Sequence, residues 1–271
     1  MIAVEIRKLV RRPRTWVSVA LLCLLPTVVA VFLALSRIAP RPGEGPAFLS
    51  AVLSNGQLYP AAALGIVLPI FLPVSVAVVA GDSIAGEAST GTLRYLLARA
   101  VGRTRLLVAK LAAVIVYTLL AVVAVAVTGY VVGVRLFGTS SLSFATSTVS
   151  GTPLTTRELL ERTVLMVLYI GWSMLGVAAV SLFLSTFTDS SLGAALGGLA
   201  VLVGSTVLVT LDAAGSVRDW LPTRYWLAWV DLFRNPVLWH DLQRGVAVQG
   251  VYIVVLLGAA WANFATRDIT S

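Results

Sequence analysis

The chain has 271 residues, of which 58% are hydrophobic and only 12% are charged, and its mean hydropathy is +0.94. Soluble domains carry about 25% charged residues, so this chain has too little polar surface for a water-soluble globule. A formal net charge of +8 would point to nucleic acid in a soluble protein. In a membrane protein, basic residues instead fix the orientation of the spans. Composition therefore favours an integral membrane protein with no nucleic-acid partner.

Stretches without charged residues locate the expected membrane spans, because a helix needs about 20 apolar residues to cross the hydrocarbon core. A further uncharged stretch, 136–156, has 11 Ser or Thr among its 21 residues and is expected to be a polar loop. We therefore predict an all-α membrane protein with six transmembrane helices in a single domain. The expected spans are about 15–36, 58–80, 111–134, 163–185, 190–211 and 247–266.

The basic residues orient these spans. With the N-terminus in the cytoplasm, the cytoplasmic segments hold 11 Lys and Arg in 52 residues, against nine in 83 residues outside. This asymmetry fits the positive-inside rule, so we expect both termini in the cytoplasm and the chain in the cytoplasmic membrane. A cleaved signal peptide is the alternative for the first span. Its 22 uncharged residues exceed the 7–15 residues or so of a signal-peptide apolar region.

Residues 1–14 are expected to form a short helix in the membrane interface. Ile2, Ile6 and Leu9 fall on one helical face, and Pro13 ends the helix before the first span. Such a helix dips apolar residues into the bilayer and turns cations to the headgroups, so membrane lipid is an expected partner. The alternative is a charge cluster that sets topology without a fixed helix. The basic residues of this segment are Arg7, Lys8, Arg11, Arg12 and Arg14.

The second expected span leads into the longest cytoplasmic segment, 82–105. Pro60, Pro69 and Pro73 predict that this span is kinked or locally unwound. Apolar residues at helical spacing after Gly91 predict a short amphipathic helix that docks another protein. The alternative is a solvated hairpin whose charges only set topology.

Glu87 is the main candidate in this loop for a contact with a partner subunit, since no charged residue lies within three positions of it. It is expected to pair with Arg94, Arg103 or Arg105 in the loop, or with a base on a partner subunit. We expect loss of this carboxylate to leave the protein folded and inserted but to weaken the association with that partner.

Motifs for catalysis are missing from the sequence. Its two lysines, Lys8 and Lys110, do not follow glycine, so there is no Walker A phosphate loop, and there is no GxSxG or HExxH. One cysteine, Cys23, and one histidine, His240, make no metal site. We expect no catalytic residues, no bound cofactor and no enzyme activity in this chain. Span centres without ionisable residues disfavour a secondary transporter and leave a permease with a separate motor, or an assembly or anchoring protein.

The segment 212–246 contains Trp220, Trp226, Trp229 and Trp239 and is expected to form one or two short helices on, or dipping into, the outer leaflet. Hydroxyl and aromatic residues within the spans are candidates to line a cavity for an amphiphilic or lipophilic cargo. The alternative is that the hydroxyl groups bond their own helix backbone. These candidates are Thr118, Tyr130, Tyr169, Trp172, Ser173 and Thr206.

Two GxxxG patterns are expected to be sites of close helix packing with no specified partner. They are Gly129 with Gly133, and Gly193 with Gly197, the latter followed directly by Gly198.

The run from Glu87 through Gly91, Thr92 and Leu93, followed by Leu96, Leu97, Arg103 and Lys110, resembles the "E…GTL..LL…R…K" loop of the six-span permease subunits of type-2 ABC exporters. The N-terminal helix is similar to the elbow helix of that family, and residues 260–269 are similar to the usual C-terminal end of its members. The turn 185–190 lies where a second cytoplasmic contact of that family would fall. The long outer segment with four tryptophans departs from the pattern.

The resemblance implies a partner ATPase, a second permease subunit in a homo- or heterodimer, and export by alternating access. It also implies that the ATPase docks around the loop 82–105. The residues expected to take part in this docking are Asp82, Glu87, Gly91, Thr92, Leu93, Arg94, Arg103 and Asp189.

Overall fold

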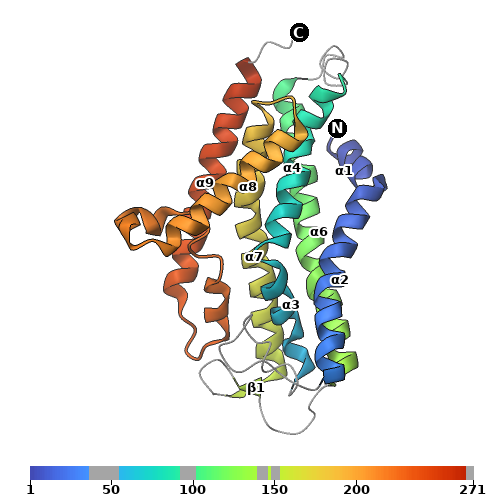
Figure 1. Cartoon of the computed structure of the whole chain (residues 1–271), viewed down its shortest axis with the longest axis vertical. Helices are drawn as coiled ribbons and strands as arrows, with labels where there is room; N and C mark the ends of the chain where they lie inside the picture. Colours follow the sequence, from blue (N-terminus) through green and yellow to red (C-terminus); the bar gives the residue numbers. More distant parts are fainter. Residues whose placement is uncertain (37–54, 92–101, 139–145, 148–152, 267–271) are drawn as a thin grey trace.

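The computed structural model describes residues 1–36, 55–91, 102–138, 146–147 and 153–266, the side chains of 146–147, 153 and 212–214 excepted. This part of the chain is helical, apart from a two-residue antiparallel pair of β1 (Thr146–Ser147) and β2 (Pro153–Leu154). Six of its helices are long and apolar enough to cross a membrane, which confirms an all-α, multi-pass membrane protein (Figure 1). They are α2 (Pro13–Ser36), α4 (Phe71–Ser89), α6 (Arg103–Phe137), α7 (Thr156–Ser185), α8 (Ser191–Thr210) and α9 (Trp239–Thr266).

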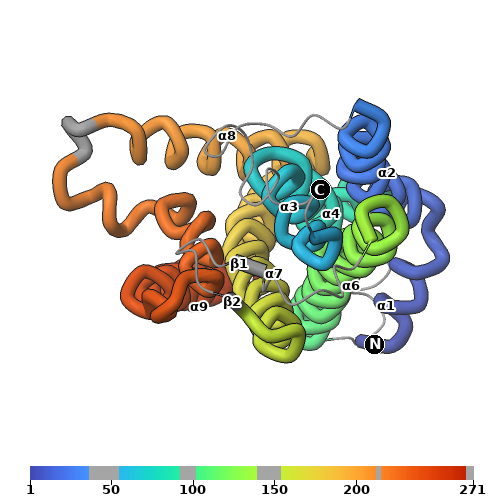
Figure 2. The backbone as a smooth tube through the Cα atoms, turned by 90° about the horizontal axis from the view of Figure 1, so that it is seen from below, coloured from blue at the N-terminus to red at the C-terminus, as the bar shows by residue number. Residues whose placement is uncertain are grey.

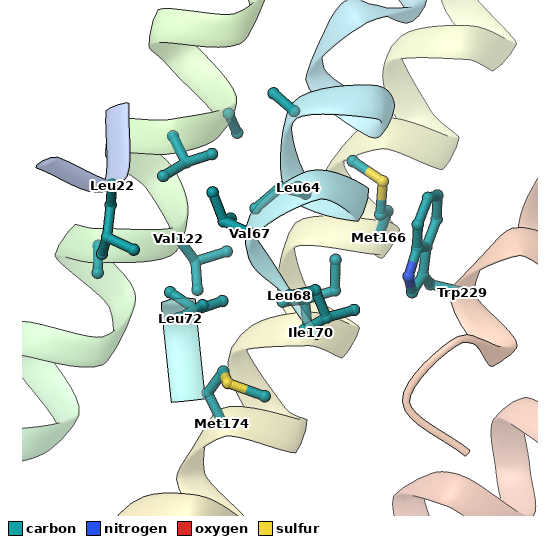
Figure 3. Close-up of a cluster of buried hydrophobic side chains, with 14 of the residues drawn as sticks. Leu22, Leu64, Val67, Leu68, Leu72, Val122, Met166, Ile170, Met174 and Trp229 are labelled. Atoms are coloured by element: carbon teal, nitrogen blue, oxygen red, sulfur yellow. The ribbon is translucent and has the colours of Figure 1, made fainter. Parts of the chain in front are cut away.

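Helices α4, α6 and α7 form the centre of the bundle (Figure 2). Helix α2 packs on α6 at one side, while α8 packs on α4 and α7, and α9 packs on α7 at the other. The core is built from fully buried apolar side chains such as Leu72, Val122 and Ile170, and Trp229 lies beside Met166 at its edge (Figure 3). Large apolar side chains also remain exposed on the outside of the bundle, where lipid would contact them.

One end of the bundle gathers the N-terminal helix α1 (Ile2–Arg11), the last turns of α4 and α9, and the first turn of α6 (Figure 1). We call it the basic end. The first helix and the last residue of α9, Thr266, thus lie at the same end, as an even number of spans requires. By the positive-inside rule, the basic residues predict that this end is the cytoplasmic one.

The second expected span is broken, as its prolines predicted. After a short 3-10 turn, η1 (Gly56–Leu58), helix α3 (Tyr59–Val67) ends before a turn at residues 68–70 that contains Pro69, and α4 follows. Helix α4 continues beyond the predicted span limit at residue 80 to Ser89 and carries Asp82 and Glu87 with it. Those charges are tolerated within a helix because they have partners in the chain.

The GxxxG pattern in α6 lets the broken span pack closely against this helix. A Cβ added at Gly133 would lie 2.3 Å from the Gly56 carbonyl oxygen and 2.4 Å from Tyr59 Cβ. In α8 the close approach is made by Gly198, where an added Cβ would lie 2.3 Å from Ser181 Oγ of α7. The glycines therefore let η1 and α3 rest directly on α6, and α8 on α7.

Several helices extend beyond the charge-free windows that predicted them. Helix α6 begins at Arg103 instead of 111, and α9 begins at Trp239 instead of 247. Helix α7 begins at Thr156, after a capping box in which Thr155 and Glu158 satisfy each other's backbone amides. A charge-free window marks the part of a helix inside the hydrocarbon, whereas the helix itself continues through the polar interface.

Candidate functional site

Helix α1 is anchored to the bundle by a mixed face and not by an apolar one. Its buried residues are Glu5 and Leu9, whereas Ile2 is 45% exposed. Glu5 therefore faces the bundle, which the periodicity of α1 alone did not predict, while Ile2 stays on the outside, where the bilayer would lie. The predicted break is confirmed, because Arg12 is extended (φ −75°, ψ 123°) immediately before Pro13.

Two side chains of the following helix close the end of α1. Thr15 Oγ1 donates to the Leu9 carbonyl at 2.8 Å, and Trp16 Nε1 donates to the Val10 carbonyl at 2.7 Å. Carbonyl groups in the last turn of a helix have no partner within that helix, so these bonds fix the corner between α1 and α2.

Four charged side chains form what we call the basic-end charge network: Glu5 and Lys8 of α1, Glu87 of α4 and Lys110 of α6. Lys110 Nζ donates to Glu5 Oε2 at 2.8 Å and also to Glu87 Oε1, and Lys8 Nζ donates to the same Glu87 oxygen. Glu5, Glu87 and Lys110 are 9%, 4% and 4% exposed. Charges so enclosed are stable only when paired, so two carboxylates and two ammonium groups hold three helices together.

The predicted pairing of Glu87 with Arg103 or Arg105 is not made in the described part of the chain. Arg103 Nη1 donates to the Ala265 carbonyl at 2.7 Å, and Arg94 lies outside the described residues. Among the described residues, Glu87 pairs with two lysines distant in sequence, Lys8 and Lys110. With 4% of its surface exposed, this carboxylate contributes to the packing of the chain itself.

The remaining docking candidates differ in accessibility. Asp82 Oδ2 accepts from Arg12 Nη1 at 3.4 Å in a partly exposed pair. Gly91 and Asp189 are exposed, and Gly91 ends α4 with a left-handed φ of 69°. Thr92 and Leu93 lie outside the described residues, as Arg94 does. On α1, the exposed side chains of Arg7 and Arg11 point away from the bundle and are free to meet headgroups.

Hydroxyl and amide side chains join the other helices at the same end. Ser185 Oγ of α7 donates to the Gly81 carbonyl at 2.7 Å and accepts from the Ala85 amide at 2.9 Å. Asn263 Nδ2 of α9 donates to the Thr186 carbonyl at 3.0 Å. Sequence reasoning missed these links, although polar residues at the ends of apolar spans are the pattern that indicates them. Hydrogen bonds and ion pairs thus join all the central helices at the basic end.

The segment between α8 and α9 returns into the bundle, and we call residues 221–233 the re-entrant segment. Tyr169 Oη of α7 donates to the Tyr225 carbonyl at 2.7 Å, and Gln249 Nε2 of α9 donates to the Pro222 carbonyl at 2.6 Å. Tyr169 lies about 24 Å along α7 from its end at Ser185, at 1.5 Å per residue. This depth falls inside a hydrocarbon core of about 30 Å.

Irregular backbone at that depth is tolerated only inside protein or beside water, and here side chains of two spans bond its carbonyl groups. The short helices of this region, η2 (Asp212–Trp220) and η3 (Ala228–Phe233), agree with the expectation of helices that dip inward. The four tryptophans of this segment differ in burial. Trp226 and Trp229 are 7% and 0% exposed, whereas Trp220 is 62% exposed.

A groove of about 450 Å³ lies between α7, α9 and η3. Two of the predicted cavity residues, Tyr169 and Trp172, line it, together with Leu232, Trp239 and Leu242. The other candidates do not line this groove: Thr118 and Thr206 donate to carbonyl groups of their own helices, Tyr130 is exposed and Ser173 is buried. For the two threonines, the alternative of backbone bonding is therefore the correct one.

Residues 24–270 match a family described as a protein of unknown function (DUF2705). The chain belongs to the DUF2705 family. No curated protein matches it. The matched region of this DUF2705 chain includes Glu87 and Lys110 of the charge network and the whole re-entrant segment, while α1 with Glu5 and Lys8 precedes it.

Proposed function

We propose that this chain is the membrane-spanning permease subunit of an ATP-driven exporter of the type-2 ABC kind, which works in the cytoplasmic membrane with a separate ATPase. The observation that carries the proposal is the basic-end charge network. It joins α1 to α4 and α6, the two helices on either side of the connection where the ATPase is expected to dock. A force on that connection therefore moves three helices together.

The proposed coupling divides two tasks between different residues. Exposed groups at the basic end, such as Gly91 and Asp189, are available to touch the ATPase. Enclosed groups, with Glu87 at their centre, transmit the movement into the spans. The links from Ser185 and Asn263 carry it on to α7 and α9.

Partly exposed charged residues between α8 and α9 support the proposal of a second permease subunit. Arg224 of the re-entrant segment and Asp219, just before that segment, approach within 4.0 Å of each other and are both partly exposed. Charged side chains within the membrane face protein or water, since hydrocarbon does not solvate them. We propose that the side between α8 and α9 faces the second subunit, with the transport path between the two. An amphiphilic or lipophilic cargo suits a path that begins beside Tyr169 and Trp172.

The test is purification of the tagged chain from its native membranes, followed by identification of the bound proteins. The proposal predicts an ATPase with a Walker A motif. Asp189→Arg should lower its recovery, whereas Glu161→Arg, at an exposed position near the opposite end of α7, should not. Recovery of other proteins without any ATPase would instead identify an assembly or anchoring protein and contradict the proposal.

A further inference from the structure

A cavity of about 220 Å³ lies at the basic end, in the corner between α1, α2, α4 and the start of α8. We call it the corner cavity. Its polar lining includes two arginines, Arg12 and Arg14, and the hydroxyl groups of Thr15, Ser18 and Ser191. One carboxylate, Asp82, also lines it, so the lining carries an excess of positive charge.

The cations of this cavity are available to an anion. Arg12 reaches Asp82 at 3.4 Å in a loose, partly exposed pair, and within the described chain no carboxylate pairs with Arg14. The first turn of α8 also faces the cavity through Ser191 and Leu192. Amide groups in the first turn of a helix lack intrahelical partners and favour anions. The corner cavity thus offers two guanidinium groups, the Ser191 hydroxyl and the N-terminus of α8 to one ligand, whereas the Thr15 and Ser18 hydroxyls already donate to backbone carbonyls.

An apolar groove of about 560 Å³ continues from this cavity between α2 and α4. Ser18 and Val78 line both spaces, and Leu25, Val29 and Val74 line the groove deeper in. From Ser18 to Val29 the groove follows α2 for about 17 Å, at 1.5 Å per residue. This length is close to half of a hydrocarbon core of about 30 Å, and hence to the depth of one leaflet.

We propose that the corner cavity and the α2–α4 groove together bind one anionic phospholipid from the leaflet at the basic end. The phosphate lies between Arg12 and Arg14, and an acyl chain lies along the groove. Charge complementarity selects the headgroup, and the continuity and depth of the groove select a lipid over a soluble anion. This site is separate from the transport path and goes beyond the proposed function, since a lipid held here would brace α2 against α4 whatever the cargo.

The experiment uses the purified full chain in phosphatidylcholine bilayers that contain a trace of spin-labelled phosphatidylglycerol or spin-labelled phosphatidylcholine. The motionally restricted fraction of each label gives its relative association constant. We expect phosphatidylglycerol to associate more strongly. Arg12→Gln and Arg14→Gln should each lower that constant by up to about fivefold, equivalent to about 1 kcal/mol per basic side chain. Arg11→Gln, which removes an exposed, headgroup-facing cation outside the cavity, should lower it by clearly less than either cavity variant.

A second pair of variants tests the groove. Val78→Trp fills the wall shared by both spaces and should abolish the preference, whereas Val123→Trp, at an exposed position of α6, should retain it. Native mass spectrometry of the same proteins should show a retained phosphatidylglycerol that is lost only in the cavity and groove variants. This second measurement separates loss of the site from a general change in the surrounding lipid.

Three results would overturn the proposal. The first is equal association of the two labelled lipids. The second is an equal fall in Arg11→Gln and Arg14→Gln, which would show a diffuse field in place of a site. The third is disulfide cross-linking of two protomers through Leu24→Cys in a Cys23→Ser background, without restricted lipid, which would make a second copy of the chain the occupant.

Discussion

Removal of single members of the basic-end charge network should destabilise the protein in a fixed order. Lys110→Met leaves two enclosed carboxylates, Glu5 and Glu87, without their shared cation and should cost about 3–5 kcal/mol. Glu87→Gln should cost less, about 1–3 kcal/mol, because Lys110 keeps its 2.8 Å bond to Glu5. Lys8→Met should cost about 0–1 kcal/mol, since the Lys8 side chain is already 39% exposed.

The double variant tests the same reasoning more strongly. Once Lys110 is replaced by Met, the network holds two carboxylates against the single ammonium group of Lys8, so adding Glu87→Gln removes the excess negative charge and should recover part of the lost stability. If the four residues did not interact, the two losses would add. The double variant should therefore be more stable than Lys110→Met alone.

The assay is reversible unfolding in mixed detergent micelles, followed by helical circular dichroism, with Arg157→Ala as the control. Arg157 belongs to an exposed pair with Glu161, whose side chains are 89% and 59% accessible, and its loss should change stability by less than about 0.5 kcal/mol. The reasoning is refuted if Lys8→Met costs as much as Lys110→Met, or if the losses in the double variant are additive.

Three further predictions concern packing, the re-entrant segment and topology. In the same unfolding assay, Gly133→Ala should lower the free energy of unfolding by about 1–3 kcal/mol, because the new methyl group meets a backbone oxygen at 2.3 Å. Gly204→Ala, which has open space around it, should raise that free energy by up to about 1 kcal/mol. Shifts of the two variants in the same direction would contradict the packing. Gln249→Leu, which strips a carbonyl at membrane depth of its donor, should lose about 1–2 kcal/mol, and Gln243→Leu, at an exposed position, should lose none; equal losses would argue against re-entry. A reporter that is active only outside the cytoplasm should be silent when fused after Ser271, and strong activity there would reverse the assigned orientation.

The spans and the break in the second of them were predictable from sequence, because both depend on local signals. Charge-free runs reveal the hydrocarbon-spanning parts of the helices, and Pro69 falls in the turn that separates α3 from α4. The ends of the helices were less predictable. Helix α4 passes Asp82 and Glu87 only because other parts of the chain neutralise them, and a charge-based window stops at such residues.

The residues of the candidate site were more predictable from sequence than the contacts between them. Glu87 was singled out from sequence, yet the lysines that pair with it are 79 and 23 residues away. Helical periodicity considers one helix at a time and gave no sign that Glu5 faces Lys110 of α6. The re-entrant segment had one available signal. Gln249 is a polar side chain within the last expected span, and such a residue usually has a polar partner in the protein.

The central claim is that an ATPase drives this chain, and transport into inverted membrane vesicles tests it most directly. The vesicles contain the chain with its co-purifying partner and are supplied with a fluorescent amphiphile. The account predicts uptake that requires ATP hydrolysis, persists when ion gradients are dissipated and falls in Lys110→Met. Uptake driven by an ion gradient without ATP, or transport of a small inorganic ion in place of the amphiphile, would contradict it.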